Sequence, residues 1–366
     1  MNSETSRKCV VLSADMEGLS VAAAYLRAGR LVAFPTETVY GLGASALNAA
    51  AIEAIFEVKG RPLSDPLIVH VCNADMARKL CVLSEGENRI FSALVESFWP
   101  GPLTLVANAA DIVPRIVTGG GDTVGLRHPR HSIAQILIEK CGLPLAAPSA
   151  NVFGHVSPTE ASHVVSDLGQ WPIWVLDGGS CTVGIESTVA KIVSESEVLI
   201  LRRGAVSAEA IRVTLERLNV KARVSVFERV VRNNSEMLSS PGQSLIHYAP
   251  AVPAFLIGQD NFENNLGPKI ALDKCALVDI GAQLSSYSSE CLAYVDLSTS
   301  GNLHEACERI FSVLRVLEKQ AGVEAILLPD LSNEDEEMAL ALADRLNRAA
   351  AFKRAKIINS FVQAYA

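Results

Sequence analysis

Short apolar runs alternate along the chain with longer segments in which apolar residues recur every three or four positions. The first pattern predicts strands and the second predicts helices, so we expect an α/β protein with a mixed sheet. In the first part of the chain, the expected strands are residues 9–12, 31–34, 66–71, 103–107, 123–126, 143–147, 172–176, 187–192 and 198–201. The expected helices are residues 19–28, 49–58, 75–80, 87–98, 132–140, a segment beginning at 158, and 208–218.

The pattern weakens between residues 221 and 250, where turn-forming residues such as Ser239-Ser240-Pro241-Gly242 leave little apolar surface to bury. We therefore predict a first domain at 1–220, a linker at 221–250 and a C-terminal domain at 251–366. In the last domain, strands are expected at 254–257, 276–280, 292–296 and 325–328, with helices at 303–320 and 335–356. This order is typical of a small open α/β domain with a parallel sheet.

Residues Ser157-Pro158-Thr159-Glu160 have the pattern of a helix start. A serine N-cap, a proline at the first helical position and a glutamate at the third together form a capping box. We therefore expect a helix to begin at Pro158, with Ser157 and Glu160 in structural rather than catalytic roles.

Composition narrows the class of protein. The 366 residues are 49% hydrophobic, which is enough to build a core without disulfide or metal support. A net charge of −8 argues against a broad nucleic-acid surface, although it is compatible with a local basic cleft. The cysteines include no Cys-x-x-Cys pair, so neither a zinc site nor a disulfide framework is indicated. The polar start of the chain and the lack of a bilayer-length apolar run predict a cytoplasmic protein.

Two short spacings carry the candidate chemistry. Lys59-Gly60-Arg61 is followed at once by Pro62, and Ser149-Ala150-Asn151 is preceded by Pro148. Near a proline the backbone favours extended conformations, in which positions i and i+2 project to the same side. We therefore expect Lys59 and Arg61 to reach toward one point and Ser149 and Asn151 toward another, as suits the phosphates and sugar of a nucleotide. Arg61 is expected to be an exposed cleft arginine. Taken singly, either pair is better explained as a solvated basic turn or an ordinary polar loop, whereas the two pairs together favour a binding site.

Further polar residues lie at or near the ends of predicted strands, where sheet proteins gather ligand groups. The chain has no Walker-type loop and no Gly-x-Gly-x-x-Gly after a strand, so a nucleotide would have to be held differently. Plainer interpretations stay open for single residues: His70 as a satisfied core histidine, and Glu37 or Glu186 as loop carboxylates. The other polar residues at predicted strand ends are Thr36, Thr38, Arg127, Ser187 and Arg203.

These candidates lie within longer motifs, which are Pro35–Leu42, Lys59–Pro62, Pro66–Val71, Pro148–Asn151, Glu186–Val189 and His247–Pro250. Together the motifs resemble those of the threonylcarbamoyl-AMP synthases, the YrdC-like enzymes, in their long form with an extra C-terminal domain. The resemblance spans nearly the whole chain in the family's order. It implies a twisted mixed α/β sheet around a large, positively lined cavity, followed by a small open, Rossmann-like α/β domain.

The resemblance implies an enzyme, a nucleotidyltransferase that converts L-threonine, bicarbonate and ATP into threonylcarbamoyl-AMP and pyrophosphate. The product would serve N6-threonylcarbamoyladenosine formation in tRNA through a downstream tRNA threonylcarbamoyl transferase complex. We expect at most a weak contact with tRNA or other RNA, and no membrane partner. Because a carbamate on the threonine amine is itself the nucleophile, no Ser, Cys or His nucleophile is needed. Mg²⁺ is expected to arrive with ATP, held mainly by phosphates and water rather than by protein ligands.

The resemblance also implies roles for the matching residues. Lys59 and Arg61 are expected to be catalytic and to bind ATP, and Arg127 is expected to pair with the threonine carboxylate. The other residues implied for ATP are Ser149, Asn151 and Arg203, those implied for the threonine amine and side chain are Thr36, Thr38, His70 and Ser187, and those implied for a lid are His247 and Tyr248. The chain departs from the family at Phe153, where a serine is usual, and at Gln243–Ile246, where basic and tyrosine residues are usual.

Two other functions stay open at this stage. A factor that binds RNA or the ribosome could use the same basic residues, but the net charge of −8 and an aromatic content of 5% count against it. A carbamoyl-transfer enzyme related to the hydrogenase-maturation proteins lacks support, because neither an acylphosphatase-like segment nor a Cys-x-x-Cys finger precedes the domain.

Overall fold

The computed structural model describes residues 8–227, 248–257, 266–358 and 360–365. The chain divides into two compact units. The first draws its described residues from 1–153, 158–182 and 186–244, and the second from 154–157, 183–185 and 245–366. The predicted domain boundaries at 220 and 250 stay a prediction, because most of the predicted linker, including Gln243–Ile246, lies outside the described residues.

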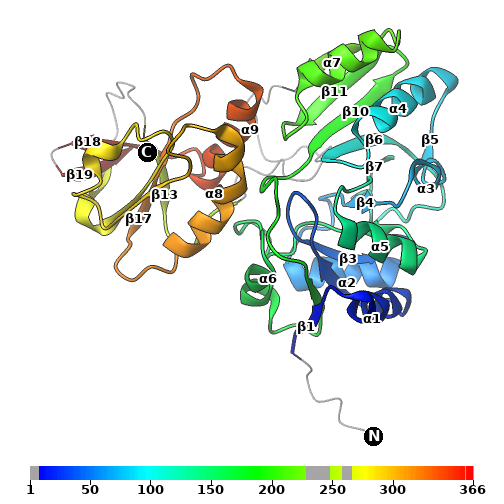
Figure 1. The fold of residues 1–366 in the computed structure, drawn as a ribbon, viewed down its shortest axis with the longest axis horizontal. Helices are drawn as coiled ribbons and strands as arrows, with labels where there is room; N and C mark the ends of the chain where they lie inside the picture. Colours follow the sequence, from blue (N-terminus) through cyan, green and yellow to red (C-terminus); the bar gives the residue numbers. More distant parts are fainter. Residues whose placement is uncertain (1–7, 228–247, 258–265, 359, 366) are drawn as a thin grey trace, which may run out of the picture. The chain divides into compact units, whose positions relative to one another are not determined.

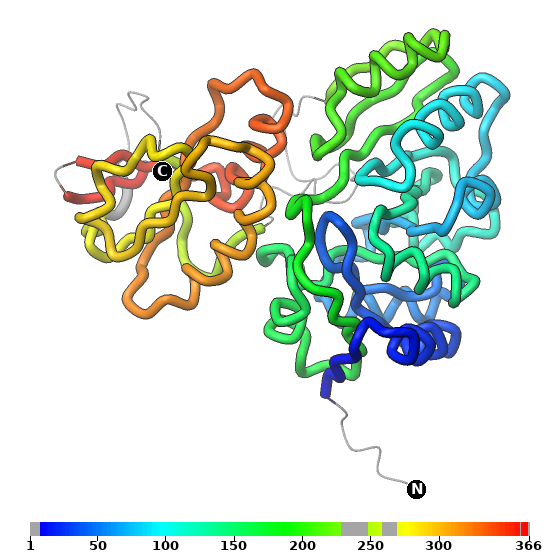
Figure 2. The backbone as a smooth tube through the Cα atoms, viewed as in Figure 1, coloured from blue at the N-terminus to red at the C-terminus, as the bar shows by residue number. Residues whose placement is uncertain are grey.

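The first unit is built on a 12-stranded sheet (Figure 1). In spatial order its strands are β1 (Val10–Ser13), β9 (Trp174–Asp177), β2 (Val32–Phe34), β3 (Gly41–Ser45), β8 (Leu145–Ala146), β4 (Ile68–His70), β7 (Thr123–Arg127), β6 (Leu103–Ala109), β10 (Thr188–Ser194), β11 (Glu197–Arg202) and β12 (Arg223–Val226), with β5 (Cys81–Val82) paired to β6. β4 and β7 run parallel, whereas β6 and β7 run antiparallel. β6 also pairs with β10, far later in the chain, and Figure 2 shows these cyan and green segments side by side. The predicted mixed sheet is confirmed, although the sequence pattern does not predict β3, β5 and β12.

Helices flank this sheet. They are α1 (Met16–Arg27), α2 (Ala49–Lys59), α3 (Ala74–Arg78), α4 (Glu85–Phe98), α5 (Ser132–Cys141), α6 (Ala161–Leu168) and α7 (Ala208–Arg217). α4 shows how the sequence specifies them. Ser84 and Glu87 form a capping box at its start, and Ile90, Phe91 and Leu94 are buried along one face. Those three side chains join the main hydrophobic core of the unit.

The helix predicted to begin at Pro158 begins later, so the predicted capping box is wrong. α6 starts at Ala161, and its N-cap residue Glu160 makes no capping hydrogen bond through its side chain. The preceding segment is held by other strands and loops instead: the Pro158 carbonyl accepts from the N–H of Tyr40 (2.8 Å), and the Thr159 carbonyl accepts from the N–H of Cys181 (3.0 Å). These long-range bonds hold the segment extended, and a local pattern cannot reveal them.

The second unit holds a 7-stranded sheet. Its order is β14 (Leu266–Ala271), β19 (Phe361–Tyr365), β18 (Arg354–Ile358), β13 (Ala254–Ile257), β17 (Ala325–Pro329), β15 (Cys275–Asp279) and β16 (Ala293–Asp296), and its helices are α8 (Leu303–Leu317), α9 (Glu337–Ala349) and the 3-10 turns η1 (Leu272–Lys274) and η2 (Ser285–Tyr287). β13, β15, β16 and β17 are parallel neighbours, as predicted. β19 pairs antiparallel with β14 and β18 and extends the sheet beyond the prediction.

The last helix is shorter than the sequence pattern predicts. α9 ends at Ala349, and Ala351 and Phe352 take positive φ angles of 49° and 61°. Left-handed backbone ends a helix, and the chain then turns into β18, where Arg354 forms an ion pair with Asp330. Basic residues such as Lys353 and Arg354 are common both in the last turn of a helix and in a strand that forms ion pairs. The sequence pattern therefore extends the helix too far.

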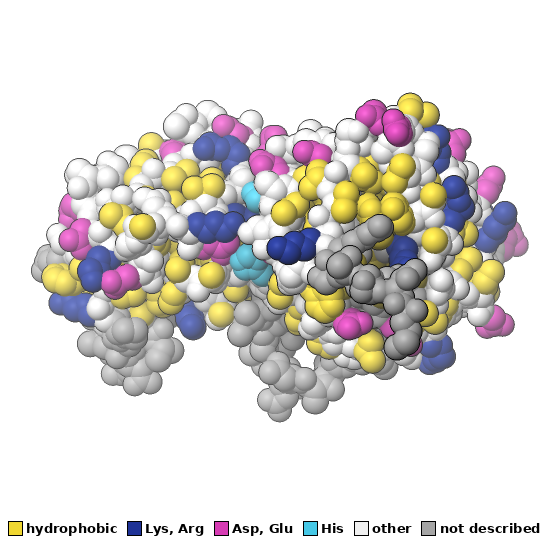
Figure 3. Space-filling model, turned by 90° about the horizontal axis from the view of Figure 1, so that it is seen from below, with side chains coloured by type: hydrophobic (Ala, Val, Ile, Leu, Met, Phe, Trp, Pro, Cys, Tyr) yellow, Lys and Arg dark blue, Asp and Glu magenta, His cyan; other side chains and the backbone are white. Residues whose placement is uncertain are grey.

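The surface of the protein carries charges of both signs. On the face shown in Figure 3, Lys and Arg side chains are interspersed with Asp and Glu side chains. In the part of the chain that the structure describes, no helix combines the length and the apolar character needed to cross a membrane. Other charged side chains are buried, among them Lys59, Arg61 and Arg127 of the first unit.

Candidate functional site

The Lys59-Gly60-Arg61 spacing does not form an extended segment, so that part of the prediction is wrong. Lys59 is the last residue of α2, and Gly60 takes a left-handed conformation with φ of 63°. The N–H groups of Gly60 and Arg61 turn back to bond the carbonyls of Glu57 and Phe56 (3.2 and 3.1 Å). Glycine suits this cap because it has no Cβ to clash. The two cations therefore leave the chain on either side of a helix cap.

Lys59 joins the two predicted nucleotide motifs. Its side chain is 1% exposed, and Nζ donates to the carbonyls of Ser149 (2.5 Å) and Asn151 (2.6 Å). Burial, and then the neighbouring Arg61, lower the pKa of Lys59 well below its ordinary value. In its charged form the amine has three donors, so among the residues that the structure describes these two carbonyls leave one N–H for a ligand. Lys59 thus directly contacts the second of the two segments that we expect to bind one nucleotide.

Arg61 is a buried side chain, so the expectation of an exposed cleft arginine is wrong. It is 6% exposed and forms an ion pair with Asp65 at 2.8 Å. Its Nη2 also donates to the Pro66 carbonyl (2.9 Å). Burial raises the pKa of Asp65 despite the opposing charges of Arg61, Lys59 and Arg202. Sequence reasoning missed Asp65. Residues 61–65 form a turn rather than a helix, so the spacing of four positions gives no signal of an ion pair.

Phe153, one of the two departures from the family pattern, contacts Arg61 through its ring and Lys59 through its backbone. Its N–H donates to the Lys59 carbonyl (2.8 Å), and its ring lies 5.8 Å from the Arg61 guanidinium. An arginine over an aromatic face is held by cation–π attraction. Phe153 therefore ties the segment after Asn151 to the end of α2, from the backbone side and from the side chain.

Arg127, Glu37 and Thr38 form a second buried group, placed by the β2–β3 turn and the end of β7. Arg127 is 4% exposed; one Nη donates to Thr38 Oγ1 (2.9 Å), and the other lies 2.9 Å from Glu37 Oε1. Burial acts to raise the pKa of Glu37, but Arg127 and nearby backbone N–H groups outweigh it and hold that pKa below its ordinary value. Glu37 is thus an ionised internal partner of Arg127, a role that the interpretation as an ordinary loop carboxylate missed.

Thr36 shapes the turn that presents this group. Its Oγ1 accepts from the N–H groups of Thr38 (3.1 Å) and Val39 (3.2 Å) and lies 2.8 Å from Thr38 Oγ1. A threonine hydroxyl bonded to the following backbone is a standard way to build a tight turn. Thr36 and Thr38 are brought together with Arg127, as the resemblance implies.

His70 ends β4 directly opposite Arg127, the last residue of β7, in the parallel register. It is 3% exposed, and burial followed by the charge of Arg127 lowers its pKa to about 3. His70 is therefore neutral near pH 7. Its Nδ1 has no hydrogen-bond partner among the residues that the structure describes. Buried polar atoms normally have partners, so this nitrogen is a candidate contact for a substrate.

Ser187 belongs to a third group, between the starts of β6 and β10 and the end of β11. Its Oγ lies 2.8 Å from Thr104 Oγ1, and Arg202 donates to its carbonyl (3.0 Å) and to its Oγ (3.2 Å). Arg202 is 8% exposed, whereas Arg203 is only partly buried. Sequence reasoning selected Arg203 and missed Arg202. The alternation of Val198, Ile200 and Arg202 along β11 is the signal that marks the inward arginine.

The arrangement can bind anions away from bulk water. Its buried cations are Lys59, Arg61, Arg127 and Arg202, its buried carboxylates are Glu37 and Asp65, and its hydroxyls are Thr36, Thr38 and Ser187. Such groups neutralise phosphates and carboxylates strongly in a low-dielectric setting. His247 lies outside the described residues. Tyr248 is buried in the second unit, 5.3 Å from the Phe311 ring and 5.9 Å from the Arg345 guanidinium, and its predicted lid role stays a prediction.

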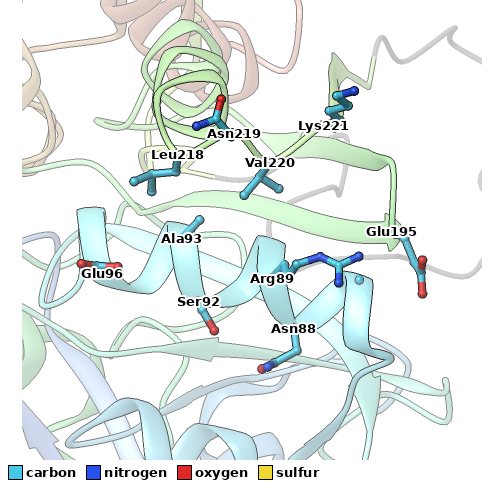
Figure 4. Close-up of a pocket in the computed structure, with 11 residues that line it drawn as sticks. Asn88, Arg89, Ser92, Ala93, Glu96, Glu195, Leu218, Asn219, Val220 and Lys221 are labelled. Carbon is cyan, nitrogen blue, oxygen red and sulfur yellow. The ribbon is translucent and has the colours of Figure 1, made fainter.

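A surface groove of the first unit is a separate feature (Figure 4). It is lined by α4, by Glu195 in the β10–β11 turn and by residues 218–221 after α7. Its charged lining residues are Arg89, Lys221, Glu96 and Glu195, and Glu96 lies at the opposite end of the groove from the other three. None of the predicted binding residues lines this groove, so it does not alter the assignment of the buried groups.

Two family models match the chain. The first, for Sua5–YciO–YrdC and described as telomere recombination, matches residues 24–204. The second, described as threonylcarbamoyl-AMP synthase, C-terminal domain, matches residues 206–351. Between them they account for most of both structural units.

Curated relatives agree with these matches. The threonylcarbamoyl-AMP synthase of Pyrococcus abyssi is 36% identical over 342 residues, which cover 93% of this chain and 96% of that protein. The enzyme of the same name from Bacillus subtilis is 41% identical over 243 residues, or 66% of this chain and 67% of that protein. That of Schizosaccharomyces pombe is 36% identical over 354 residues, with coverage of 87% and 84%.

Solved structures give the same picture. The crystal structure of Pyrococcus abyssi Sua5 complexed with L-threonine superposes with a TM-score of 0.79 at 32% identity, and the match covers 96% of this chain and 100% of that one. A doubly substituted variant of the same protein gives a TM-score of 0.78 at 31% identity, with coverage of 95% and 98%.

The Arg61–Asp65 pair yields a stability prediction. We expect Arg61→Ala to lower the free energy of unfolding by about 3–5 kcal/mol, because it strands the buried Asp65 carboxyl group. The matched control is Arg89→Ala, which removes the equally spaced ion pair with Glu85, where the side chains are 61% and 93% exposed. That change should have little effect. Urea unfolding followed by circular dichroism measures both, and equal losses for the two variants would contradict the buried assignment.

His70 yields a pH prediction. Its imidazole is neutral in the folded protein, with a pKa of about 3, and titrates near its ordinary value of 6.5 when unfolded. Between pH 3 and pH 6.5 the unfolded chain therefore binds more protons than the folded protein. The contribution of His70 to the free energy of unfolding is present above pH 6.5 and is lost as the pH falls below it. From pH 7 to pH 5 the loss through this group is about 2 kcal/mol. His70→Gln should show a correspondingly smaller fall in urea titrations, whereas identical curves for the two proteins would refute the assignment.

Proposed function

Because the chain belongs to the threonylcarbamoyl-AMP synthase family, we propose that the buried groups of its first unit are where L-threonine, bicarbonate and ATP become threonylcarbamoyl-AMP and pyrophosphate. The observation that carries this assignment is the contact of Lys59 Nζ with the carbonyls of Ser149 and Asn151. It unites the two motifs that the sequence predicts for ATP, beside the buried Arg61. The enzyme is a nucleotidyltransferase that acts on ATP and L-threonine.

At the ATP-binding residues, the main role of the protein would be to neutralise the negative charge of the triphosphate. The remaining donor of Lys59 and the guanidinium of Arg61 would face the triphosphate, with Ser149, Asn151 and Arg203 around the nucleotide. Asp65 now balances Arg61 at 2.8 Å, and a bound phosphate would share or take over that role. Fixed cations in a dry site stabilise the charge that develops on the α-phosphate as pyrophosphate leaves. In this proposal Lys59 and Arg61 are the catalytic residues.

On the amino-acid side, Arg127 would bind the threonine carboxylate. Its present partner Glu37 occupies the guanidinium at 2.9 Å, so the substrate carboxylate would add to or displace that pairing. Thr36, Thr38 and Ser187 offer hydroxyls, and neutral His70 offers its Nδ1 to the amine or the side-chain hydroxyl. A neutral imidazole beside an amine avoids the repulsion that a cationic one would cause.

The chemical step needs no protein nucleophile. Bicarbonate and the threonine amine give a carbamate and water, and a carbamate oxygen then forms a bond to the α-phosphorus of ATP. The bond from that phosphorus to the bridging oxygen breaks, and pyrophosphate carries away the electron pair. The protein contributes alignment, charge neutralisation and exclusion of water, which protects a labile carbamate.

Mg²⁺ would enter as part of the nucleotide substrate. Among the described residues, no group of three or more His, Cys, Asp or Glu side chains is placed to hold a metal ion. A magnesium ion bound through phosphate oxygens and water fits such surroundings. It would supply charge neutralisation on the phosphates, while Lys59 and Arg61 orient them.

The chemistry of the product supports a proposal for the downstream partner. An activated threonylcarbamoyl group must be consumed by an acceptor, which supports delivery to a tRNA threonylcarbamoyl transferase complex. The face in Figure 3 mixes charges of both signs, so we expect that face to make at most a weak contact with RNA. A cytoplasmic location stays a prediction.

Pyrophosphate release tests the proposed function. We expect release from ATP to require both threonine and bicarbonate, because the carbamate is the attacking group. A coupled phosphate assay with each substrate omitted in turn measures it. Release that is indifferent to threonine would contradict the proposal. Tight, steeply salt-dependent RNA binding without any threonine dependence would favour the RNA-binding alternative.

A further inference from the structure

Two short segments that flank the candidate binding residues belong to the second unit. Residues 154–157 follow Asn151 closely in the chain, and residues 183–185 closely precede Ser187. Both segments contact α8 or the residue that ends it. Loop segments flanking binding residues are normally held by the scaffold that carries those residues. Here the second unit supplies that support.

The 154–157 segment is held through its main chain and one side chain. Arg315 on α8 donates from Nη2 to the Val156 carbonyl and from Nε to the Ser157 carbonyl (3.5 Å). His155 Nε2 lies 3.0 Å from Oε2 of Glu318, the C-cap residue of α8. Arg315 is 2% exposed, so water cannot readily replace these bonds. The arginine fork thus fixes two successive carbonyls of the segment.

The 183–185 segment lies directly on the α8 backbone. Gly184 has a φ of +77°, and a Cβ built on it would stand 2.3 Å from the Cys307 carbonyl oxygen and 2.4 Å from the Glu308 Cα. Only glycine allows that approach, because the atoms in the way are main chain and cannot move aside. Two independent contacts therefore hold the two segments on the same helix.

We infer that α8 is a positioning element for the site: Arg315 and Glu318 fix the segment that leads back to Asn151, and the Gly184 contact fixes the segment that leads to Ser187. The inference rests on the proposed function for the roles of Asn151 and Ser187. Only a few residues separate each held segment from the candidate site. Phe153, next to the first segment, bonds the Lys59 carbonyl (2.8 Å), and Ser187, two residues after the second, accepts from Arg202 (3.2 Å). A shift at either anchor therefore passes to a binding residue within a few bonds. This gives the second unit a part in catalysis without placing any of its side chains on a substrate.

The test uses the full-length chain and two matched pairs of variants. Arg315→Met is compared with Arg309→Met, since Arg309 on the same helix also donates to two carbonyls, those of Asp296 (3.0 Å) and Leu297 (2.6 Å), which do not belong to the site. Gly184→Ala is compared with Gly301→Ala, a glycine with a similar φ of +74° and open space around it. The readouts are KM for ATP and for threonine, and hydrogen exchange of residues 149–157 and 183–187.

We expect Arg315→Met to raise KM for ATP by about 10- to 100-fold, with faster exchange at 149–157, since small displacements of binding groups have effects of this size. Gly184→Ala should raise KM for threonine, with faster exchange at 183–187. The two controls should change neither. Unchanged KM values and exchange in Arg315→Met and Gly184→Ala would overturn the inference.

Two further variants keep the inference testable if Arg315→Met fails to fold. If Arg315→Met does not fold, Arg315→Lys and Glu318→Gln take its place. Lysine keeps the charge but cannot hold two carbonyls in a fork, so a partial rise in KM for ATP supports the inference and wild-type behaviour overturns it. If the wild-type chain releases no pyrophosphate, the proposed function fails, whereas the exchange comparison still decides whether α8 holds these segments.

Discussion

Lys59 is almost fully buried at the end of α2, and two main-chain carbonyls, those of Ser149 and Asn151, compensate its ammonium group there. Removing a charged group from water costs several kcal/mol, so the surrounding structure has to supply partners at fixed places. The Gly60 cap turns the chain after Lys59, and the segment that follows β8 supplies the two carbonyls. One desolvated cation thus ties together two segments that are distant in the sequence.

Two buried arginines, Arg61 and Arg127, also need partners that compensate their charge. Arg61 is balanced by Asp65 and Arg127 by Glu37, each within 3 Å. An internal carboxylate holds each guanidinium in place before any substrate arrives, and it resembles the anionic group that the substrate would bring. Preorganised charges need little rearrangement during the reaction, which is the main source of electrostatic catalysis. The cost is a set of buried ion pairs that stabilise the fold weakly but cannot be broken singly.

The sequence predicts much of this, and the failures share a cause. The apolar runs predict most of the strands and helices of both units. The motifs assign the Lys59 and Ser149–Asn151 segments to one nucleotide, but they do not predict that Lys59 bonds the Ser149 and Asn151 carbonyls. Local patterns fail where distant contacts decide. The helix expected at Pro158 is held extended by bonds from Tyr40 and Cys181, and β3 lies in a glycine-rich run with a weak strand pattern. Asp65, Glu37 and Arg202 look like ordinary loop or strand-end charges until folding buries them. The two carboxylates then lie beside arginines, and Arg202 bonds Ser187.

The most direct test of this account is a crystal structure of the chain with threonine and an ATP analogue that has a methylene bridge between the α- and β-phosphates. The account predicts phosphate oxygens within hydrogen-bonding distance of Lys59 and Arg61, with the Lys59 contacts to the Ser149 and Asn151 carbonyls retained. Phosphates bound elsewhere, with Arg61 still paired to Asp65 and no phosphate oxygen near it, would contradict it.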